Sequence, residues 1–160
     1  MAEETAWREA ISRLLDWEEA HASFDAATGG LAEPLRGRVP PGLPYSPWQL
    51  LEHLRIAQED LLDFCRNPDY RERSWPADYW PAQPQPPSAA AWDESVRRFR
   101  EDRAALQALA RDRSVDLTAK IPHGSGQTYL RELLLAADHA AYHVGELIVV
   151  RRLLGAWPVR

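Results

Sequence analysis

Two histidines near the C-terminus have a spacing that would let them share one ligand. They are His139 and His143, four residues apart in DHAAYHVGEL, which is otherwise mostly apolar. Residues four apart lie on one face of an α-helix, one turn from each other. Two imidazoles in such a helix are explained either by hydrogen-bond partners inside a core or by a shared metal ion. The sequence supports the metal only if it supplies a third ligand.

His53 is the candidate third ligand among the five histidines. It lies in PWQLLEHLRIA, a segment with helical periodicity, and its helical neighbours include the small Ala57 and the polar Asp60. His123, in IPHGSGQ, is interpreted as an ordinary loop residue. Three neutral imidazoles suit zinc, nickel, copper or iron, and three protein ligands leave a coordination position for water or substrate. Because H-x-x-x-H is a weak signal, ordinary hydrogen bonding of these rings stays open as the alternative.

Other catalytic motifs are missing from the sequence. Residues 140–142 are AAY, so the glutamate base of H-E-x-x-H is absent. His53 and His139 lack the glutamate three residues earlier that a carboxylate-bridged di-iron bundle requires. There is no G-x-S-x-G, phosphate loop or nucleotide fingerprint. The single cysteine, Cys65, excludes an internal disulfide framework and is interpreted as a small buried residue rather than a nucleophile.

Four segments have the helical periodicity needed to position these side chains, and no strand-like alternation is visible. The first helix is expected over about residues 4–27. The second begins sharply at SPWQ, where Ser46 and Gln49 form a capping box and Pro47 occupies the first helical position. Pro68 then ends this helix.

The third helix is expected over about residues 88–112, and the fourth over 128–155. The fourth is apolar nearly all round, so it should be the most buried. The connections 28–45, 67–87 and 113–127 are long for an up-and-down bundle. Long links permit at least one crossover that runs the length of the bundle.

Residues 67–87, which we call the strap, contain six prolines. So much proline is compatible with disorder, but aromatic residues are scarce in disordered segments. Trp75, Tyr79 and Trp80 therefore favour an ordered segment lying across the helices. These rings would cover the core, or else form one wall of a pocket.

The bulk properties fit one domain, residues 1–160. The net charge is −5 and no run of Lys and Arg is present, so we expect no nucleic-acid partner. No apolar run reaches the roughly 18 residues of a membrane helix. The N-terminal MAEETAWREA lacks the apolar core of a signal peptide. We therefore expect a cytoplasmic protein that does not bind membranes.

SPWQLLEHL and DHAAYHVGELIVVRRLLGAWP resemble the DinB/YfiT-like superfamily of bacterial proteins, and the resemblance covers almost the whole chain. It implies an all-α, up-down-down-up four-helix bundle with long connecting loops. It also implies a divalent metal, most often zinc or nickel, held by His53, His139 and His143. Characterised relatives include S-transferases and isomerases that use low-molecular-weight thiols, and some metal-dependent hydrolases; dimers are common.

The resemblance thus predicts a metal-dependent thiol S-transferase or hydrolase acting on a small molecule, with a low-molecular-weight thiol as co-substrate and a homodimeric state. The alternative is a non-catalytic stress-response or interaction bundle whose metal site is structural or vestigial.

Glu146 stands where many relatives carry glutamine. It lies three residues after His143 and seven after His139, on the same helical face. A carboxylate there could orient a ligand imidazole or act as a catalytic acid or base. A solvent-facing side chain, or one paired with an arginine such as Arg55, is the competing interpretation.

Two polar residues of the first helix are also candidates. In an up-down-down-up bundle the C-terminal half of that helix would approach His53. Glu18 and His21 are therefore expected to line a cofactor-binding pocket above the metal, whereas Asp25 on the same face is expected to meet solvent. The alternative is that the helix leaves the bundle there and the whole face meets solvent.

Overall fold

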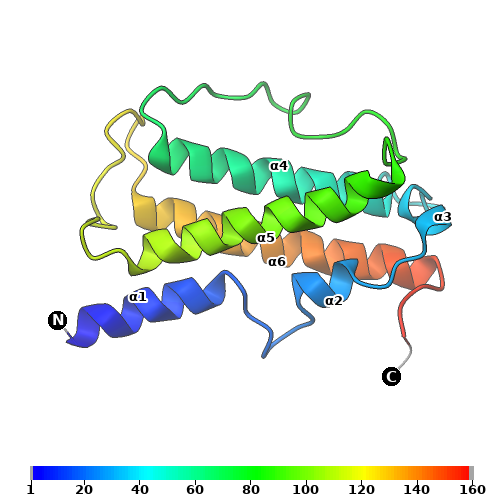
Figure 1. The fold of residues 1–160 in the computed structure, drawn as a ribbon, viewed down its shortest axis with the longest axis horizontal. Coiled ribbons are helices and arrows are strands. Elements are labelled where there is room, and N and C mark those ends of the chain that lie inside the picture. Colours follow the sequence, from blue (N-terminus) through cyan, green and yellow to red (C-terminus); the bar gives the residue numbers. More distant parts are fainter. Residues whose placement is uncertain (1, 159–160) are drawn as a thin grey trace.

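The computed structural model describes residues 2–158, and these form helices and loops without a β-strand (Figure 1). The helices are α1 (Ala2–Leu14), α2 (Phe24–Thr28), α3 (Glu33–Arg36), α4 (Pro47–Arg66), α5 (Ala89–Arg111) and α6 (Tyr129–Leu153). The predicted all-α class is confirmed. The bounds expected for the last three long helices agree with α4, α5 and α6 to within two residues at each end.

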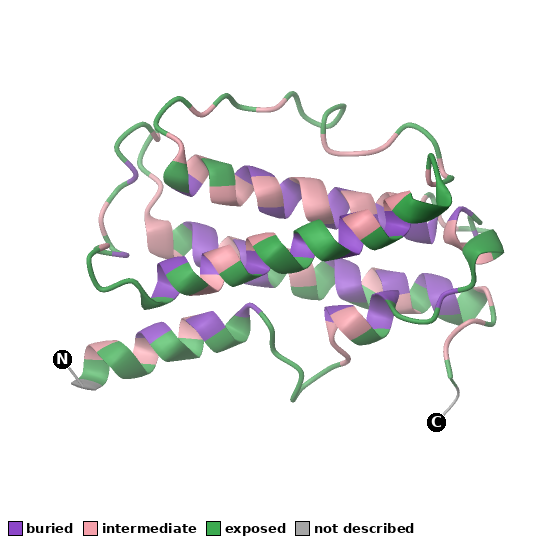
Figure 2. Ribbon diagram, in the orientation of Figure 1, coloured by how far each residue is buried: buried purple, intermediate pink, exposed green. Residues whose placement is uncertain are grey.

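The four long helices lie side by side. α4 packs against both α5 and α6, and α1 packs against α5. α1 and α6 run in one direction along the molecule, and α4 and α5 run in the other (Figure 1). Buried, intermediate and exposed residues recur along each long helix, as expected of helices with one face turned inward (Figure 2).

The start of α4 is fixed by the predicted capping box. The Ser46 hydroxyl accepts the backbone N–H of Gln49 at 3.1 Å, and the Gln49 side-chain oxygen accepts that of Ser46 at 3.2 Å. Pro47 occupies the first turn, where its missing N–H costs nothing. This defined start sets the register of α4 and places His53 in its second turn.

The predicted first helix, residues 4–27, is wrong in its second half. α1 ends at Leu14 and the next helix starts only at Phe24. The connecting segment has one large aromatic side chain, Trp17, and this remains 41% exposed, so little apolar surface ties a continuing helix to the bundle. The break allows Phe24 to stack on Phe99 of α5, with 4.0 Å between ring centroids.

The strap is ordered, as predicted, and runs along the length of α4 (Figure 1). The C-terminal part of the strap is hydrogen-bonded to the two residues that cap the start of α4. The Ser46 hydroxyl donates to the Pro84 carbonyl at 2.6 Å, and the Gln49 amide donates to the Pro81 carbonyl at 3.1 Å. The strap is the crossover that two consecutive parallel helices, α4 and α5, require.

α6 is long and apolar enough to cross a membrane, judged by length and composition only. The core helix of a globular protein passes the same test. In this structure α6 packs against α4 and α2 and carries His139 and His143. The absence of membrane binding stays a prediction.

Candidate metal centre

The structure brings together the three histidines that the sequence singles out. His53 comes from α4, and His139 and His143 come from successive turns of α6. The Nε2 atom of His53 lies 3.1 Å from the Nε2 atoms of both other rings. The candidate ligand atoms of all three residues lie within 4.8 Å of one another. His53 and His143 are buried, and His139 is partly exposed.

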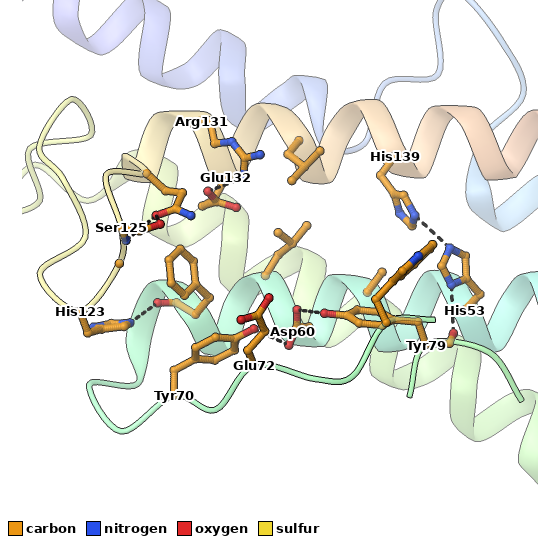
Figure 3. A pocket seen from close by; sticks show the side chains of 17 residues that line it. His53, Asp60, Tyr70, Glu72, Tyr79, His123, Ser125, Arg131, Glu132 and His139 are labelled. Carbon is orange, nitrogen blue, oxygen red and sulfur yellow. Dashed lines mark hydrogen bonds and ion pairs between the residues drawn. The ribbon is translucent and has the colours of Figure 1, made fainter. Parts of the chain in front are cut away.

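The opposite nitrogens of two of these rings have fixed partners. His53 Nδ1 lies 3.0 Å from the backbone carbonyl oxygen of Tyr79, and Figure 3 shows His53 between this carbonyl and His139. His143 Nδ1 lies 2.6 Å from the Glu146 carboxylate. A carbonyl and a carboxylate only accept hydrogen bonds, so Nδ1 of each ring carries the proton. In the neutral rings both Nε2 atoms therefore present lone pairs.

Two lone pairs facing each other at 3.1 Å repel unless a cation lies between them. Burial, and next to it the neighbouring histidines, lower the pKa of His139 to about 3 and that of His143 to about 4. The rings are therefore neutral at neutral pH. Two nitrogens bound to one tetrahedral zinc at about 2.0–2.1 Å lie roughly 3.3 Å apart. The donor set fits a divalent transition metal.

A cavity of about 580 Å³ opens beside the histidines. His53 and His139 lie at one end, and the loop around His123 lies at the other (Figure 3). Between them the walls come from α4, α6 and the strap; they include Ala57, Asp60, Trp75, Tyr79 and Glu132. A ligand in the cavity can therefore reach the point where the imidazoles converge.

A family model described as the DinB superfamily matches residues 16–147, most of the chain and all three histidines. The chain belongs to the DinB superfamily. Comparisons with curated proteins and with solved structures found no match.

Glu146 of this DinB-superfamily protein contacts a candidate ligand directly. Its hydrogen bond to Nδ1 fixes the proton and the orientation of the His143 ring, the role that carboxylates commonly have beside metal-bound imidazoles. The alternative partner, Arg55, binds Glu52 and Glu59 instead. Glu146 does not line the cavity, which favours orientation of the ring over acid–base catalysis.

Glu18 and His21 are not brought to the metal centre. Both are exposed in the segment between α1 and α2, because the helix that should have carried them ends at Leu14. They line a surface depression with Gly145 and Arg152 of α6, separate from the cavity beside His53.

The aromatic residues of the strap have both predicted roles: two form part of the pocket wall, and one covers the core. Trp75 is 70% exposed and lines the cavity, as does Tyr79. Trp80 packs against the apolar core and stacks on the His53 ring, with 3.8 Å between centroids and 5° between planes. One residue of the strap therefore covers a face of a candidate metal ligand.

Two groups near the metal centre were not predicted as functional. The Tyr79 carbonyl belongs to the backbone, and no residue type signals its position. Asp60 accepts a hydrogen bond from the Tyr79 hydroxyl. Asp60 follows His53 by seven residues and so lies on the same helical face, and this spacing could have indicated from the sequence that Asp60 is near the site.

Proposed function

We propose that this DinB-superfamily protein binds one divalent metal ion through His53, His139 and His143 and uses it to transform a small molecule in the adjoining cavity. We place the site in an up-down-down-up four-helix bundle to which α2 and α3 are additions. Zinc and nickel are the first candidates, since imidazole nitrogen suits both. Two observations carry the proposal: the three imidazoles converge, and two of them, His53 and His143, hold their protons on the nitrogen opposite the point of convergence.

Two features support catalysis over a purely structural metal. Structural zinc sites usually have four protein ligands, whereas catalytic sites keep an open position. Within residues 2–158 no fourth histidine, cysteine or carboxylate joins the three histidines. The cavity adjoins His53 and His139, so the remaining position is open to a small ligand.

The carboxylates around the site support a thiol rather than water as the nucleophile. Glu146 is engaged by His143, Asp60 by Tyr79, and the buried Glu132 by Arg131. Glu132 is also two helical turns, roughly 10 Å, from His139. None of these three carboxylates is therefore free to act as a base at the metal, and Glu72, the other carboxylate that lines the cavity, is an exposed residue of the strap.

A bound divalent metal supplies Lewis acidity that lowers the pKa of a coordinated water or thiol. A thiol, with a pKa of about 8.5, needs far less assistance to ionise than water does. We therefore propose thiol S-transfer to an electrophilic small molecule first and hydrolysis second. A low-molecular-weight thiol as co-substrate and a homodimeric state are further proposals that rest on the family. A cytoplasmic location is a proposal that rests on the single cysteine of the sequence.

The test uses the full chain loaded with one equivalent of zinc or nickel. The protein is mixed with a panel of low-molecular-weight thiols and electrophiles, and loss of free thiol is followed; a panel of esters and amides is run in parallel. We expect thiol conjugation that disappears in His139→Ala and after chelation. Activity on the esters and amides alone would show that the protein is a hydrolase rather than a thiol S-transferase. Inactivity in both panels with metal bound would support the structural or vestigial site instead.

A further inference from the structure

The strap places two consecutive residues on one metal ligand. The Tyr79 carbonyl accepts the Nδ1 proton of His53 at 3.0 Å, and the Trp80 ring lies flat against the same imidazole at 3.8 Å. The carbonyl selects the tautomer with Nε2 free, and the stacked ring restricts rotation of the imidazole. The orientation of a ligand from α4 is therefore set by a segment without regular secondary structure.

Tyr79 is held at its other end as well. Its hydroxyl donates to Asp60 Oδ2 at 2.6 Å, and Asp60 lies seven residues after His53 on α4 (Figure 3). Seven residues are two helical turns, or roughly 10 Å. One tyrosine therefore spans two turns of α4, with its carbonyl on the metal ligand and its hydroxyl on a carboxylate of the same helix.

Asp60 is an anchor for the strap. Its other oxygen, Oδ1, accepts the Tyr70 hydroxyl at 3.1 Å and lies 3.5 Å from Arg73 Nε. The side chain is 11% exposed, so water competes little for these bonds. Burial, followed by the interactions with Asp60, raises the pKa of Tyr79 and raises that of Tyr70 to about 12, so both phenols stay protonated donors. Because two phenols of the strap donate to Asp60 and a guanidinium of the strap is ion-paired with it, the carboxylate is occupied in holding the strap.

We propose that Asp60 and Tyr79 are positioning residues of the metal centre, acting on His53 through the strap. The inference rests on the proposed metal site. Without the Tyr79 hydroxyl bond, the carbonyl of that residue is no longer held against Nδ1, and His53 loses its preference for the tautomer that binds metal. Partners of metal-bound histidines typically contribute 10- to 100-fold in affinity. Because the ends of the strap stay attached, we expect about tenfold weaker zinc binding in Tyr79→Phe.

Tyr70→Phe is the matched control. Each substitution removes one phenol hydroxyl from Asp60, but only Tyr79 also carries the carbonyl that binds His53. Zinc affinity is measured by competition with a chromophoric chelator, and thermal melting of the metal-free proteins gives their stability. We expect similar melting temperatures for the two variants, but zinc binding in Tyr70→Phe within about threefold of wild type. Equal loss of affinity in both would overturn the inference.

A second readout separates this inference from the proposed function. Long-range ¹H–¹⁵N spectra of the metal-free full chain report the tautomer of His53 without any metal. We expect the Nδ1–H form in wild type and in Tyr70→Phe, and a mixture of tautomers in Tyr79→Phe and in Asp60→Asn. An unchanged tautomer in both Tyr79→Phe and Asp60→Asn would contradict the positioning role even if zinc binds. Failure of wild type to bind either zinc or nickel would instead refute the proposed function and, with it, this inference.

Discussion

Replacement of Glu146 tests whether its hydrogen bond to His143 contributes to the proposed metal binding. The carboxylate is 2.6 Å from His143 Nδ1, a short charge-assisted bond, and partners of this kind contribute about 10- to 100-fold in metal affinity. The Glu146 side chain is 38% exposed, so water can replace part of its contribution. We therefore expect the lower end of the range for Glu146→Ala, about tenfold, or about 1.4 kcal/mol.

Glu146→Gln separates the hydrogen bond from the charge. The amide oxygen of glutamine can still accept the Nδ1 proton, so we expect a loss of less than about threefold. Zinc affinity is measured at pH 7 by competition with a chromophoric chelator. Glu101→Ala, which removes an exposed glutamate of α5, is the control for charge alone. Wild-type affinity in Glu146→Ala would refute the orienting role, and equal loss in the Ala and Gln variants would show that charge, not hydrogen bonding, matters.

Two further predictions concern buried groups outside the metal centre. The Arg151 side chain is 5% exposed and donates to the carbonyls of Ala27 and Gly29 at the C-terminal end of α2 and to that of Ala156. Arg151→Ala should therefore lower the free energy of unfolding in urea by about 3 kcal/mol. The exposed neighbour Arg152 is the control, and an equal effect of Arg152→Ala would contradict this account. Burial raises the pKa of Cys65 from 9.0 to about 12, so at pH 8 iodoacetamide should alkylate the native thiol on the order of a thousandfold more slowly than the urea-unfolded chain. Comparable rates in the two states would show that the thiol is not buried.

The sequence predicted the helices best where local chemistry decides the structure. Ser46, Pro47 and Gln49 form a complete helix-start signal, and α4 begins as they require. The prediction of the first helix failed because its periodic pattern continued through polar residues, which no buried face supports. Ser23 caps α2, with its hydroxyl accepting the Ala26 N–H, and this serine is the signal in the sequence for a second helix start.

The three histidines of the candidate metal centre were predictable from the sequence, but the groups that hold their rings in place were not. The spacing of His139 and His143 fixes their shared face on any α-helix, and the approach of His53 follows from the packing of α4 on α6. The Tyr79 carbonyl reaches His53 only because the strap takes a specific path along α4. That path depends on contacts between residues distant in sequence, such as Tyr79 with Asp60, which composition and periodicity do not encode.

The metal content of five histidine-to-alanine variants tests the central claim most directly. The tag-free full chain and each variant are purified in parallel, loaded with zinc or, in a second set, with nickel, passed over a gel-filtration column and analysed by inductively coupled plasma mass spectrometry. We predict about one equivalent in wild type, His21→Ala and His123→Ala, and a loss of most of the metal in His53→Ala, His139→Ala and His143→Ala. Equal metal content in all five variants, or none in wild type, would contradict the account.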